Sequence, residues 1–403
     1  MKPYILPLAD DSFGQEEKDA MSQVIESGNY TMGAKVEEFE SSFAEWVGAN
    51  HSIMVNSGSS ANLLLVYSQL VSSFKEASLL PGDEVLVPAL LWPTTVWPLI
   101  QFGLKPVLVD IDSQSLGLCL EDARQKITEK TKAIFLIHIL GYACDMDKYA
   151  SFCSTNKLTL MEDCCESFGA FHNQKSVGRF GVGGTFSHFF SHHLTTMEGG
   201  TIITDDDELV NDLRSMRAHG WTRNRTDANK ISKKFPDLDP RFLFLIPGFN
   251  VRPMEIQAAV GLVQLKRINE LLDFRMKFAK FIIDVFKPIS WIKIVGSNRV
   301  SLAQSHVDRN HSWMNIPFTL EDDAPQVVNV IKDIFENHGV ETRPIITGNF
   351  MMQPAASYLG SQGYFPNAQE ISERGFMIGC HAMEVSEDLQ ATIQNIVKAL
   401  QNL

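Results

Sequence analysis

The sequence predicts an α/β protein in which residues 1–250 form a large domain around a mainly parallel sheet and residues 251–403 form a smaller α+β domain. Three observations support this prediction. The chain has 403 residues, of which 44% are hydrophobic, so it can bury one large core and a smaller one. Short aliphatic runs alternate with helix-like segments in the first half of the chain. After Pro253 the apolar residues recur at helical spacing and lead into a region richer in strand-like runs.

The predicted sheet of the large domain consists of short β-branched and aliphatic runs separated by helix-like segments. This alternation is typical of a parallel sheet covered by helices on both faces. Ligands of such sheets bind beyond the carboxyl ends of the strands, and polar motifs follow several of these runs, so we expect one shared site at that edge. The runs are residues 53–55, 84–87, 106–110, 133–138, 158–162 and 201–204.

The second part of the chain is predicted to follow an exposed loop at 222–241, where Arg, Lys, Asp and Pro are frequent and no apolar periodicity is visible. A long helix then begins after Pro253. Two strand-like and two helix-like runs complete a small α+β domain. These runs are residues 291–295, 313–318, 327–336 and 389–400.

Composition excludes several classes of partner. The formal net charge is −13, and the 35 Lys and Arg are scattered, so we expect no nucleic-acid partner. Asp10 and Asp11 stand where a signal peptide needs a basic start, and prolines interrupt the apolar stretch at 85–100, so we expect no membrane segment. The six cysteines have neither a CxxC pair nor metal-ligand spacing, which indicates reduced thiols of a cytoplasmic protein without a metal.

A Gly/Ser turn after the first strand is the first candidate for ligand binding. Gly58, Ser59 and Ser60 follow the run 53–55 and precede an apolar helical segment. Backbone N–H groups at the start of a helix, together with the helix dipole, suit a phosphate dianion. Taken alone, these residues favour an ordinary N-capped helix after a turn.

Two further segments carry side chains suited to an aromatic cofactor. Trp92 follows the run 84–87 and offers an aromatic face to a flat ring, although a single Trp is more often part of a core. Asp163 follows the run 158–162, which ends in Glu162, and Glu166 lies three residues further on. A carboxylate at this point can hold a pyridine nitrogen protonated, whereas the alternative is that Asp163 caps the next helix.

The segment from Gly184 to Gly200 brings a hydroxyl at Ser187 and an imidazole at His192 into one motif that ends in Glu-Gly-Gly. The glycines are typical of a tight turn where backbone approaches a ligand. His192 and His193 are adjacent, and paired histidines can bind a metal. Adjacent side chains diverge, however, and no third ligand is evident.

These four segments, in this order and spacing, resemble the DegT/DnrJ/EryC1/StrS family of sugar aminotransferases, which are pyridoxal-phosphate enzymes of fold type I, the aspartate-aminotransferase-like fold. The resemblance covers nearly the whole chain. It extends to residues 30–33, 217–224, 247–253 and 343–350. It implies that the large domain binds pyridoxal 5'-phosphate or pyridoxamine 5'-phosphate and that the protein is a homodimer with active sites shared between subunits.

His192 is the main departure from the family pattern. Counted back from Glu198-Gly199-Gly200, it occupies the position of the lysine that binds the cofactor covalently in the aminotransferases. Imidazole cannot form that bond, although it can move protons near neutral pH. A histidine here is typical of two groups of sugar 3-dehydratases, one of which needs an iron–sulfur cluster bound by four cysteines after the histidine. No cysteine lies between Cys165 and Cys380, so the chain is similar to the iron-free group.

The resemblance also implies roles for individual residues. Gly58, Ser59, Ser60 and Ser187 would bind the cofactor phosphate, Trp92 would stack on the pyridine ring, and Asp163 would pair with the ring nitrogen. Asn250 would reach the phosphate of the neighbouring subunit. His192 is the expected catalytic base. Glu166 and His219 are further catalytic candidates, and a purely structural role for His219 is an equal alternative.

The reaction that the resemblance implies is removal of the 3-hydroxyl from a nucleotide-linked 4-keto-6-deoxy hexose. In the iron-free group this substrate is GDP-4-keto-6-deoxy-D-mannose of the colitose pathway, which supplies O-antigen sugars of lipopolysaccharide. L-glutamate provides the amino group and ammonia is released. Two alternatives stay open: a nucleotide-sugar aminotransferase that works without a covalent lysine–cofactor bond, and a non-catalytic homologue.

Overall fold

The computed structural model describes residues 4–9, 12–300 and 305–403. Its large sheet has seven strands in the order β1-β9-β8-β5-β4-β2-β3. β9 is antiparallel to β1 and β8, and the other pairings are parallel, so β9 alone in this sheet runs against the rest. The predicted mainly parallel sheet is confirmed. The strands are β1 (His51–Val55), β2 (Glu84–Pro88), β3 (Lys105–Val109), β4 (Thr131–Ile137), β5 (Thr159–Asp163), β8 (Gly183–Ser187) and β9 (Gly200–Thr204).

Helices cover both faces of the sheet because its strands are apolar on both sides. In β2, Val85 and Val87 point into one hydrophobic cluster and Leu86 points into another. The first cluster is formed with α3 (Gly58–Leu70), α4 (Pro93–Gln101) and α7 (Asp207–Arg217), and the second with α5 (Leu120–Lys126) and α6 (Met146–Asn156). A third cluster, with α2 (Ala34–Val47) and part of α9 (Glu255–Phe286), covers the remainder.

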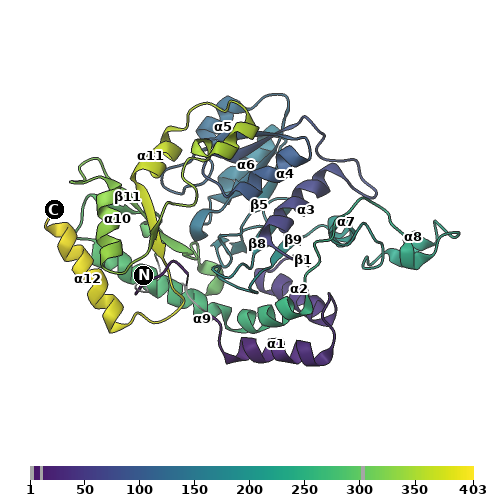
Figure 1. The fold of residues 1–403 in the computed structure, drawn as a ribbon. Coiled ribbons are helices and arrows are strands. Elements are labelled where there is room, and N and C mark those ends of the chain that lie inside the picture. Colours follow the sequence, from purple (N-terminus) through teal and green to yellow (C-terminus); the bar gives the residue numbers. More distant parts are fainter. Residues whose placement is uncertain (1–3, 10–11, 301–304) are drawn as a thin grey trace.

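The smaller part of the chain is built on a four-stranded antiparallel sheet in the order β10-β11-β13-β12 (Figure 1). Four of its elements match the predicted runs: β10 (Ile292–Ile294), β11 (Asn315–Leu320), α10 (Val328–Asn337) and α12 (Glu387–Gln401). The elements not expected from the sequence are β12 (Thr342–Arg343), β13 (Gly375–Gly379) and α11 (Pro366–Arg374).

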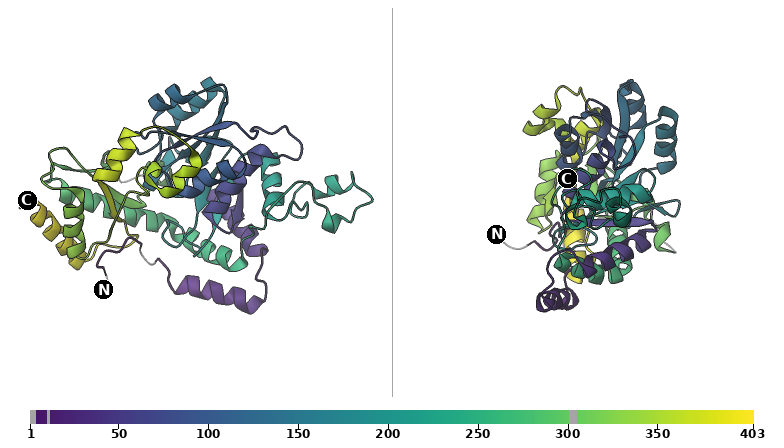
Figure 2. Two further views of the ribbon diagram at one scale, coloured as in Figure 1. Left: turned by 45° about the horizontal axis from the view of Figure 1, so that its top comes forward. Right: turned by 90° about the vertical axis from the view of Figure 1, so that its right-hand side faces the viewer.

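The helix α9 links the two hydrophobic cores. It begins shortly after Pro253, as predicted, and its first half packs in the third cluster of the large sheet. Its second half, from Met276 to Phe286, packs in the core of the small sheet. The helix α1 (Gln15–Ser27) lies along the outer side of α9 (Figures 1 and 2). Since α9 contributes to both cores, the domain boundary at residue 250 stays a prediction.

The N-terminal segment joins the small sheet rather than the large one. Leu6 forms a parallel bridge with Val340, and the backbone N–H of Leu8 donates to Glu341 Oε2 at 3.0 Å. His381 Nε2 lies 2.7 Å from the carbonyl oxygen of Pro7. The N-terminal segment therefore packs against residues 340–381 of the C-terminal part of the chain.

Two surface features complete the fold. The predicted loop 222–241 is largely exposed and contains the short helix α8 (Ala228–Ser232), which projects from the body of the molecule (Figure 1). At the edge of the large sheet, the side chain of Gln362 pairs with β3: the N–H of Leu108 donates to Oε1 at 2.9 Å, and Nε2 donates to the carbonyl of Pro106 at 3.2 Å. None of the described helices combines the length and apolar character needed to cross a membrane.

Candidate active site

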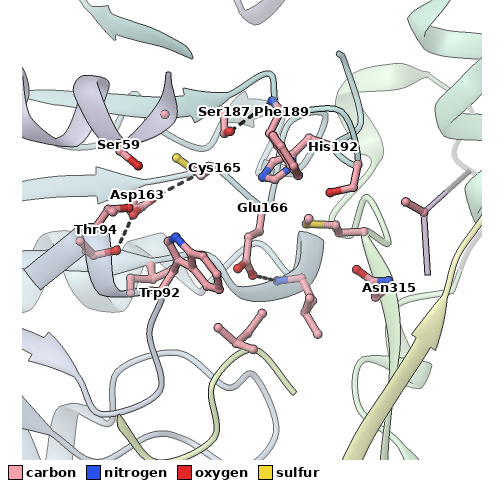
Figure 3. Close-up of a pocket in the computed structure, with 18 of the residues that line it drawn as sticks. Ser59, Trp92, Thr94, Asp163, Cys165, Glu166, Ser187, Phe189, His192 and Asn315 are labelled. Carbon is pink, nitrogen blue, oxygen red and sulfur yellow. Dashed lines mark hydrogen bonds between the residues drawn. The ribbon is translucent and has the colours of Figure 1, made fainter. Parts of the chain in front are cut away.

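A cavity of about 540 Å³ opens at the carboxyl ends of the parallel strands, where the sequence predicts the site (Figure 3). Seven of the predicted site residues line it. The large domain also contributes Asn62, Thr94, Thr95 and Cys165, and the small sheet and N-terminal segment contribute Leu8, Ala9, Asn315 and Arg343. The predicted residues in the lining are Gly58, Ser59, Trp92, Asp163, Glu166, Ser187 and His192.

The start of α3 forms an anion-binding corner. Ser57 is the N-cap, and its Oγ accepts the N–H of Ser60 at 3.1 Å, which leaves the amides of Gly58 and Ser59 at the open end of the helix. A Cβ on Gly58 would lie 2.6 Å from Cβ of Ser187, so only glycine fits here. The Ser187 hydroxyl therefore lies beside these amides, an arrangement suited to a phosphate.

Asp163 is fixed as a rigid carboxylate at the end of β5. It is only 4% exposed. Its Oδ2 accepts from Asn62 Nδ2 and Thr95 Oγ1, both at 2.7 Å, and its Oδ1 accepts the N–H of Cys165 at 3.0 Å. Three neutral donors hold the group in place without neutralising it, so its charge is available to a cationic nitrogen in the cavity.

Asn62 and Thr95 are site residues that the prediction lacks. Asn62 stands four positions after Gly58, one turn further along α3, so it faces the same way as the cavity-lining start of the helix. Thr95 belongs to the segment Trp92-Pro93-Thr94-Thr95. Asn62 lies two residues after Ser60 and Thr95 lies three residues after Trp92, and this proximity to predicted site residues was the signal available in the sequence.

Trp92 does not belong to the core. It is 57% exposed and serves as the N-cap residue of α4, and its indole turns toward the cavity near Asp163 and Glu166 (Figure 3). An exposed aromatic ring on the wall of a cavity offers a flat face to a planar ligand. The alternative of an ordinary core tryptophan is therefore wrong.

His192 enters the cavity from a tight turn, in which its N–H donates to the carbonyl of Phe189 at 3.0 Å. The two rings meet edge to face, with centroids 5.9 Å apart. Burial, with a smaller contribution from the positive charge of Arg275, lowers the pKa of His192 to about 4. Nδ1 is enclosed and has no hydrogen-bond partner among the described residues, so Nε2 is the nitrogen that faces the cavity. The imidazole is therefore unprotonated at neutral pH, with its free Nε2 toward the cavity.

His193 is not part of the cavity lining, so the adjacent histidines do not form a pair of metal ligands there. It is 2% exposed, and its Nε2 lies 3.1 Å from the carbonyl oxygen of Ser312. That contact joins the motif of His192 to the segment that leads into β11. The role of His193 is to anchor the turn rather than to contact a ligand.

Glu166 lies in the cavity wall as a buried carboxyl group with one backbone donor, the N–H of Leu140 at 2.9 Å from Oε2. Burial, with a smaller contribution from the negative charge of Asp163, raises the pKa of Glu166 to about 8. The group is therefore largely protonated at neutral pH and can donate a hydrogen bond to a ligand.

Replacement of Glu166 by glutamine is expected to stabilise the cofactor-free protein increasingly as the pH rises from about 5 to about 8, and fully above that. The wild-type carboxyl keeps its proton up to a pKa of about 8 when folded but loses it near its ordinary pKa of 4.5 when unfolded, so stability falls as the pH rises between these values. Glutamine carries no such charge. We expect the free energy of unfolding of Glu166→Gln, measured with urea, to exceed that of the wild type by on the order of 2 kcal/mol at about pH 9 and by little at about pH 5. Equal gains at both pH values would contradict the assigned burial effect.

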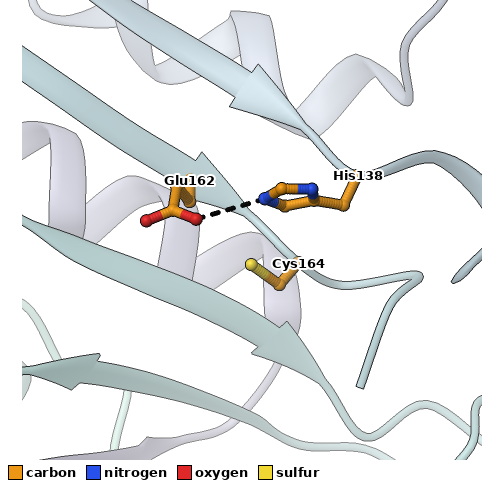
Figure 4. A group of neighbouring side chains, drawn as sticks. All are labelled: His138, Glu162 and Cys164. Atoms are coloured by element: carbon orange, nitrogen blue, oxygen red, sulfur yellow. Dashed lines mark hydrogen bonds and ion pairs between the residues drawn. The ribbon is translucent and has the colours of Figure 1, made fainter. Parts of the chain in front are cut away.

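Glu162 has a different function from Asp163, because successive side chains of β5 point to opposite faces. Its Oε1 accepts the N–H groups of Phe180 and Gly181, at 2.6 and 2.9 Å, and its Oε2 accepts the N–H of Gly178 at 2.7 Å. His138 Nε2 lies 3.1 Å from Oε2, with Cys164 adjacent (Figure 4). His138 Nδ1 accepts the N–H of Cys144 at 3.2 Å, so Nε2 carries the proton and donates. Four donors occupy the carboxylate, which makes this cluster a structural support rather than a metal site.

Three predicted site residues do not line the cavity of this chain. The Ser60 hydroxyl accepts from Ser57 Oγ at 3.0 Å. His219 and Asn250 are exposed and lie on neighbouring segments, since Asn250 bridges to Ala218. His219 has a φ of 62° and packs its ring against Trp221. The roles predicted for these residues stay predictions.

Comparisons with known proteins agree with this geometry. A GDP-4-keto-6-deoxy-D-mannose 3-dehydratase of Yersinia pseudotuberculosis is 38% identical over 398 residues, which are 97% of this chain and 98% of that protein. Two solved structures of such dehydratases are 34% identical: the E. coli enzyme with bound hydrated PLP and an enzyme with a trapped PLP-glutamate geminal diamine. Both have a TM-score of 0.88, and they cover 99% and 98% of this chain and 100% of their own chains. Residues 11–400 match the model of one family. The chain belongs to the DegT/DnrJ/EryC1/StrS aminotransferase family.

Proposed function

We propose that this chain is a 3-dehydratase that depends on pyridoxal phosphate and pyridoxamine phosphate and acts on GDP-4-keto-6-deoxy-D-mannose. L-glutamate provides the amino group, and ammonia and a 4-keto-3,6-dideoxy sugar are the products. The observation that carries the proposal is the neutral imidazole of His192 in the cavity, at the position where aminotransferases of the family have lysine. Near full-length similarity to named dehydratases supports the same substrate.

The cavity fits the cofactor on three independent grounds. The start of α3 leaves no room for a Cβ at Gly58 and brings two helix amides beside Ser187, which suits a phosphate. Asp163 is a buried carboxylate held by three neutral donors, which suits a protonated ring nitrogen. Trp92 supplies an exposed aromatic face. When bound, the cofactor supplies an amine and a conjugated ring that withdraws electrons from the adjacent carbon.

The chain itself supplies the proton transfers. His192 Nε2 faces the cavity as an unprotonated nitrogen and removes a proton from the reacting carbon. The same nitrogen then returns the proton to the 3-hydroxyl of the sugar as that group leaves. The negative charge of Asp163 would stabilise the protonated ring nitrogen of the bound cofactor during both transfers. No lysine lines the cavity among the described residues, so no side-chain amine competes for the cofactor and the reaction ends in net dehydration.

The biological setting follows from the substrate. A 4-keto-3,6-dideoxy sugar linked to GDP is a precursor of colitose, and the curated relatives include a lipopolysaccharide biosynthesis protein of Salmonella typhimurium. We therefore assign the enzyme to the synthesis of an O-antigen sugar. The cytoplasm is the proposed location, since Cys164 and Cys165 lie side by side in the sequence as thiols without a disulfide.

The proposed active unit is a homodimer with shared sites. Phe235, Leu238, Phe242 and Phe244 are large apolar side chains exposed on or beside the projecting segment 222–241. An exposed apolar cluster of this kind favours a protein interface. His219 and Asn250 flank this segment and are also exposed. We propose that they reach the cavity of the partner subunit.

Subunit mixing tests the shared site. His192→Asn and Asn250→Ala are each expected to be inactive as homodimers, because every site lacks one of the two residues. In a heterodimer, one site is intact and the other lacks both. An equal mixture that exchanges subunits should therefore regain about a quarter of wild-type activity. No recovery, with exchange verified by differently tagged subunits, would place both residues in the same subunit's site.

Mass spectrometry of the sugar tests the reaction. The protein is incubated with pyridoxal phosphate, L-glutamate and GDP-4-keto-6-deoxy-D-mannose, without added iron, and ammonia is assayed in parallel. We expect a product that lacks one oxygen and an equimolar release of ammonia. A product that has gained nitrogen would mean aminotransfer, and absence of turnover with several nucleotide sugars would favour a non-catalytic homologue.

A further inference from the structure

The turn at 189–197, which carries His192, has one hydrogen bond to the rest of the fold. Among the described residues, every other hydrogen bond of this turn stays within the motif that ends in Glu-Gly-Gly. The exception is His193, whose Nε2 lies 3.1 Å from the carbonyl oxygen of Ser312. Leu194 packs in the third hydrophobic cluster, but apolar packing does not fix a direction. The orientation of the turn therefore depends on one directional contact.

This contact has a defined donor. A carbonyl oxygen only accepts, so Nε2 of His193 carries a hydrogen and donates it to Ser312. Burial, with smaller contributions from the charges of Arg275 and His192, lowers the pKa of His193 well below its ordinary value. The ring is therefore neutral, and its Nδ1 is enclosed without a hydrogen-bond partner among the described residues. His193 thus has no second hydrogen bond that could replace the first.

The acceptor belongs to a fixed segment, residues 309–315, which we call the strap. The strap leads into β11, and the ring of its buried Trp313 stacks on that of His311 with centroids 3.8 Å apart. Four backbone hydrogen bonds tie it to the segment 140–171, so the carbonyl of Ser312 has a fixed position. They run from Phe171 to Arg309 at 2.7 Å, from Ala143 to Asn310 at 3.2 Å, from Ser312 to Gly141 at 2.8 Å and from Met314 to Leu140 at 3.0 Å.

The strap is also part of the cavity wall. Met314 and Asn315 line the cavity, and they follow Ser312 by two and three residues. A ligand that contacts these residues is therefore placed by the same segment that holds His193. The position of His192 relative to such a ligand depends on the contact between His193 and the strap.

We propose that His193 is a positioning residue for His192 and that its hydrogen bond to Ser312 holds the base at the distance from the ligand that the strap defines. This inference rests on the proposed function, in which His192 transfers the proton. Proton transfer requires the two atoms to lie within hydrogen-bond reach, and a displacement of about 1 Å can lower the rate by about 10²-fold. His193 acts in this way without contacting a ligand.

Three substitutions of His193 separate positioning from packing. His193→Phe keeps a ring but removes the N–H group. His193→Gln places an amide N–H near the position of Nε2, whereas His193→Asn carries the same amide one carbon short of the carbonyl. We expect kcat, measured as ammonia release with pyridoxal phosphate, L-glutamate and GDP-4-keto-6-deoxy-D-mannose, to fall by about 10²-fold in the Phe and Asn variants, with KM for the sugar within about two-fold of wild type. The Gln variant should recover most of the loss.

His381→Phe is the matched control. His381 is also buried, and its Nε2 lies 2.7 Å from the carbonyl oxygen of Pro7, but it is outside the cavity lining. This variant should lose stability and keep kcat in the molecules that remain folded. Melting temperatures of all variants separate a folding defect from a loss of kcat.

Crystal structures of the variants give a measurement that does not depend on turnover. Nε2 of His192 should move by about 1 Å or more in the Phe or Asn variant and stay in place in the Gln variant. An unmoved ring, a kcat within about two-fold of wild type in the Phe and Asn variants, or an equal loss in the Gln variant would overturn the proposal. A wild-type protein that releases no ammonia would contradict the proposed function, and the crystal structures would still decide whether His193 fixes His192.

Discussion

Replacing His192 by lysine is expected to abolish dehydration and to attach the cofactor to the protein. An amine at this position condenses with the cofactor aldehyde, whereas imidazole cannot. Loss of the general base lowers kcat for dehydration by about 10³-fold. Borohydride reduction followed by mass spectrometry should detect a covalent adduct in His192→Lys and none in the wild type. Turnover is measured as ammonia released in the presence of the keto sugar and L-glutamate.

His192→Asn separates the two effects of the lysine variant. It removes the base without adding an amine, so it should lose dehydration and form no covalent adduct. His172→Lys is a control for a histidine-to-lysine change outside the cavity, because His172 lies on the β6 strand (Phe171–His172). Dehydration by His192→Lys at the wild-type rate would exclude His192 as the catalytic base.

Replacing Asp163 by asparagine is expected to cause the second large loss, about 10³-fold in kcat, with the fold retained. The substitution keeps the size of the side chain but removes the negative charge that opposes a protonated ring nitrogen. It also leaves Asn62 Nδ2 and Thr95 Oγ1 facing an amide where they now donate to a carboxylate oxygen. Steady-state kinetics together with the cofactor absorbance spectrum measure the loss.

Asp212→Asn is a suitable comparison for Asp163→Asn. Asp212 is also a buried carboxylate, but it is bonded to Ser72, Ser73 and Arg225 outside the cavity. This variant should lose stability through its broken ion pair and retain catalysis in the molecules that remain folded. If Asp163→Asn kept activity within about ten-fold of wild type, the proposed pairing with the ring nitrogen would be excluded.

The sheet and its functional edge could be predicted because they rest on local patterns. Strand-like runs followed by polar motifs place Gly58, Trp92 and Asp163 at one edge, and the structure brings them into one cavity. The strand β8 has the sequence Gly-Gly-Thr-Phe-Ser, which carries little strand propensity. Its glycines are required by packing, since a Cβ on Gly184 would lie 2.2 Å from Cα of Gly178. That requirement is visible only in three dimensions.

The second half of the cavity could not be predicted from local patterns. Arg343, Asn315 and Leu8 lie far from the cofactor motifs in the sequence, and their approach depends on how the small sheet docks on the large one. The directions of the Glu162 and Asp163 side chains also could not be predicted from the local sequence. Two adjacent carboxylates look equivalent in the sequence, but the alternation along β5 directs one to the cavity and the other to a backbone support. The roles proposed for His219 and Asn250 rest on a second subunit.

The side chain of Gln362 at β3 has a consequence for how the protein behaves in solution. An uncovered edge strand exposes backbone groups that can pair with the edge of another molecule and seed aggregates. Gln362 occupies the N–H of Leu108 and the carbonyl of Pro106, and it comes from the C-terminal part of the chain. A segment more than 200 residues downstream therefore occupies part of this edge, and we expect shortening the chain before Gln362 to expose backbone groups of β3 that favour self-association.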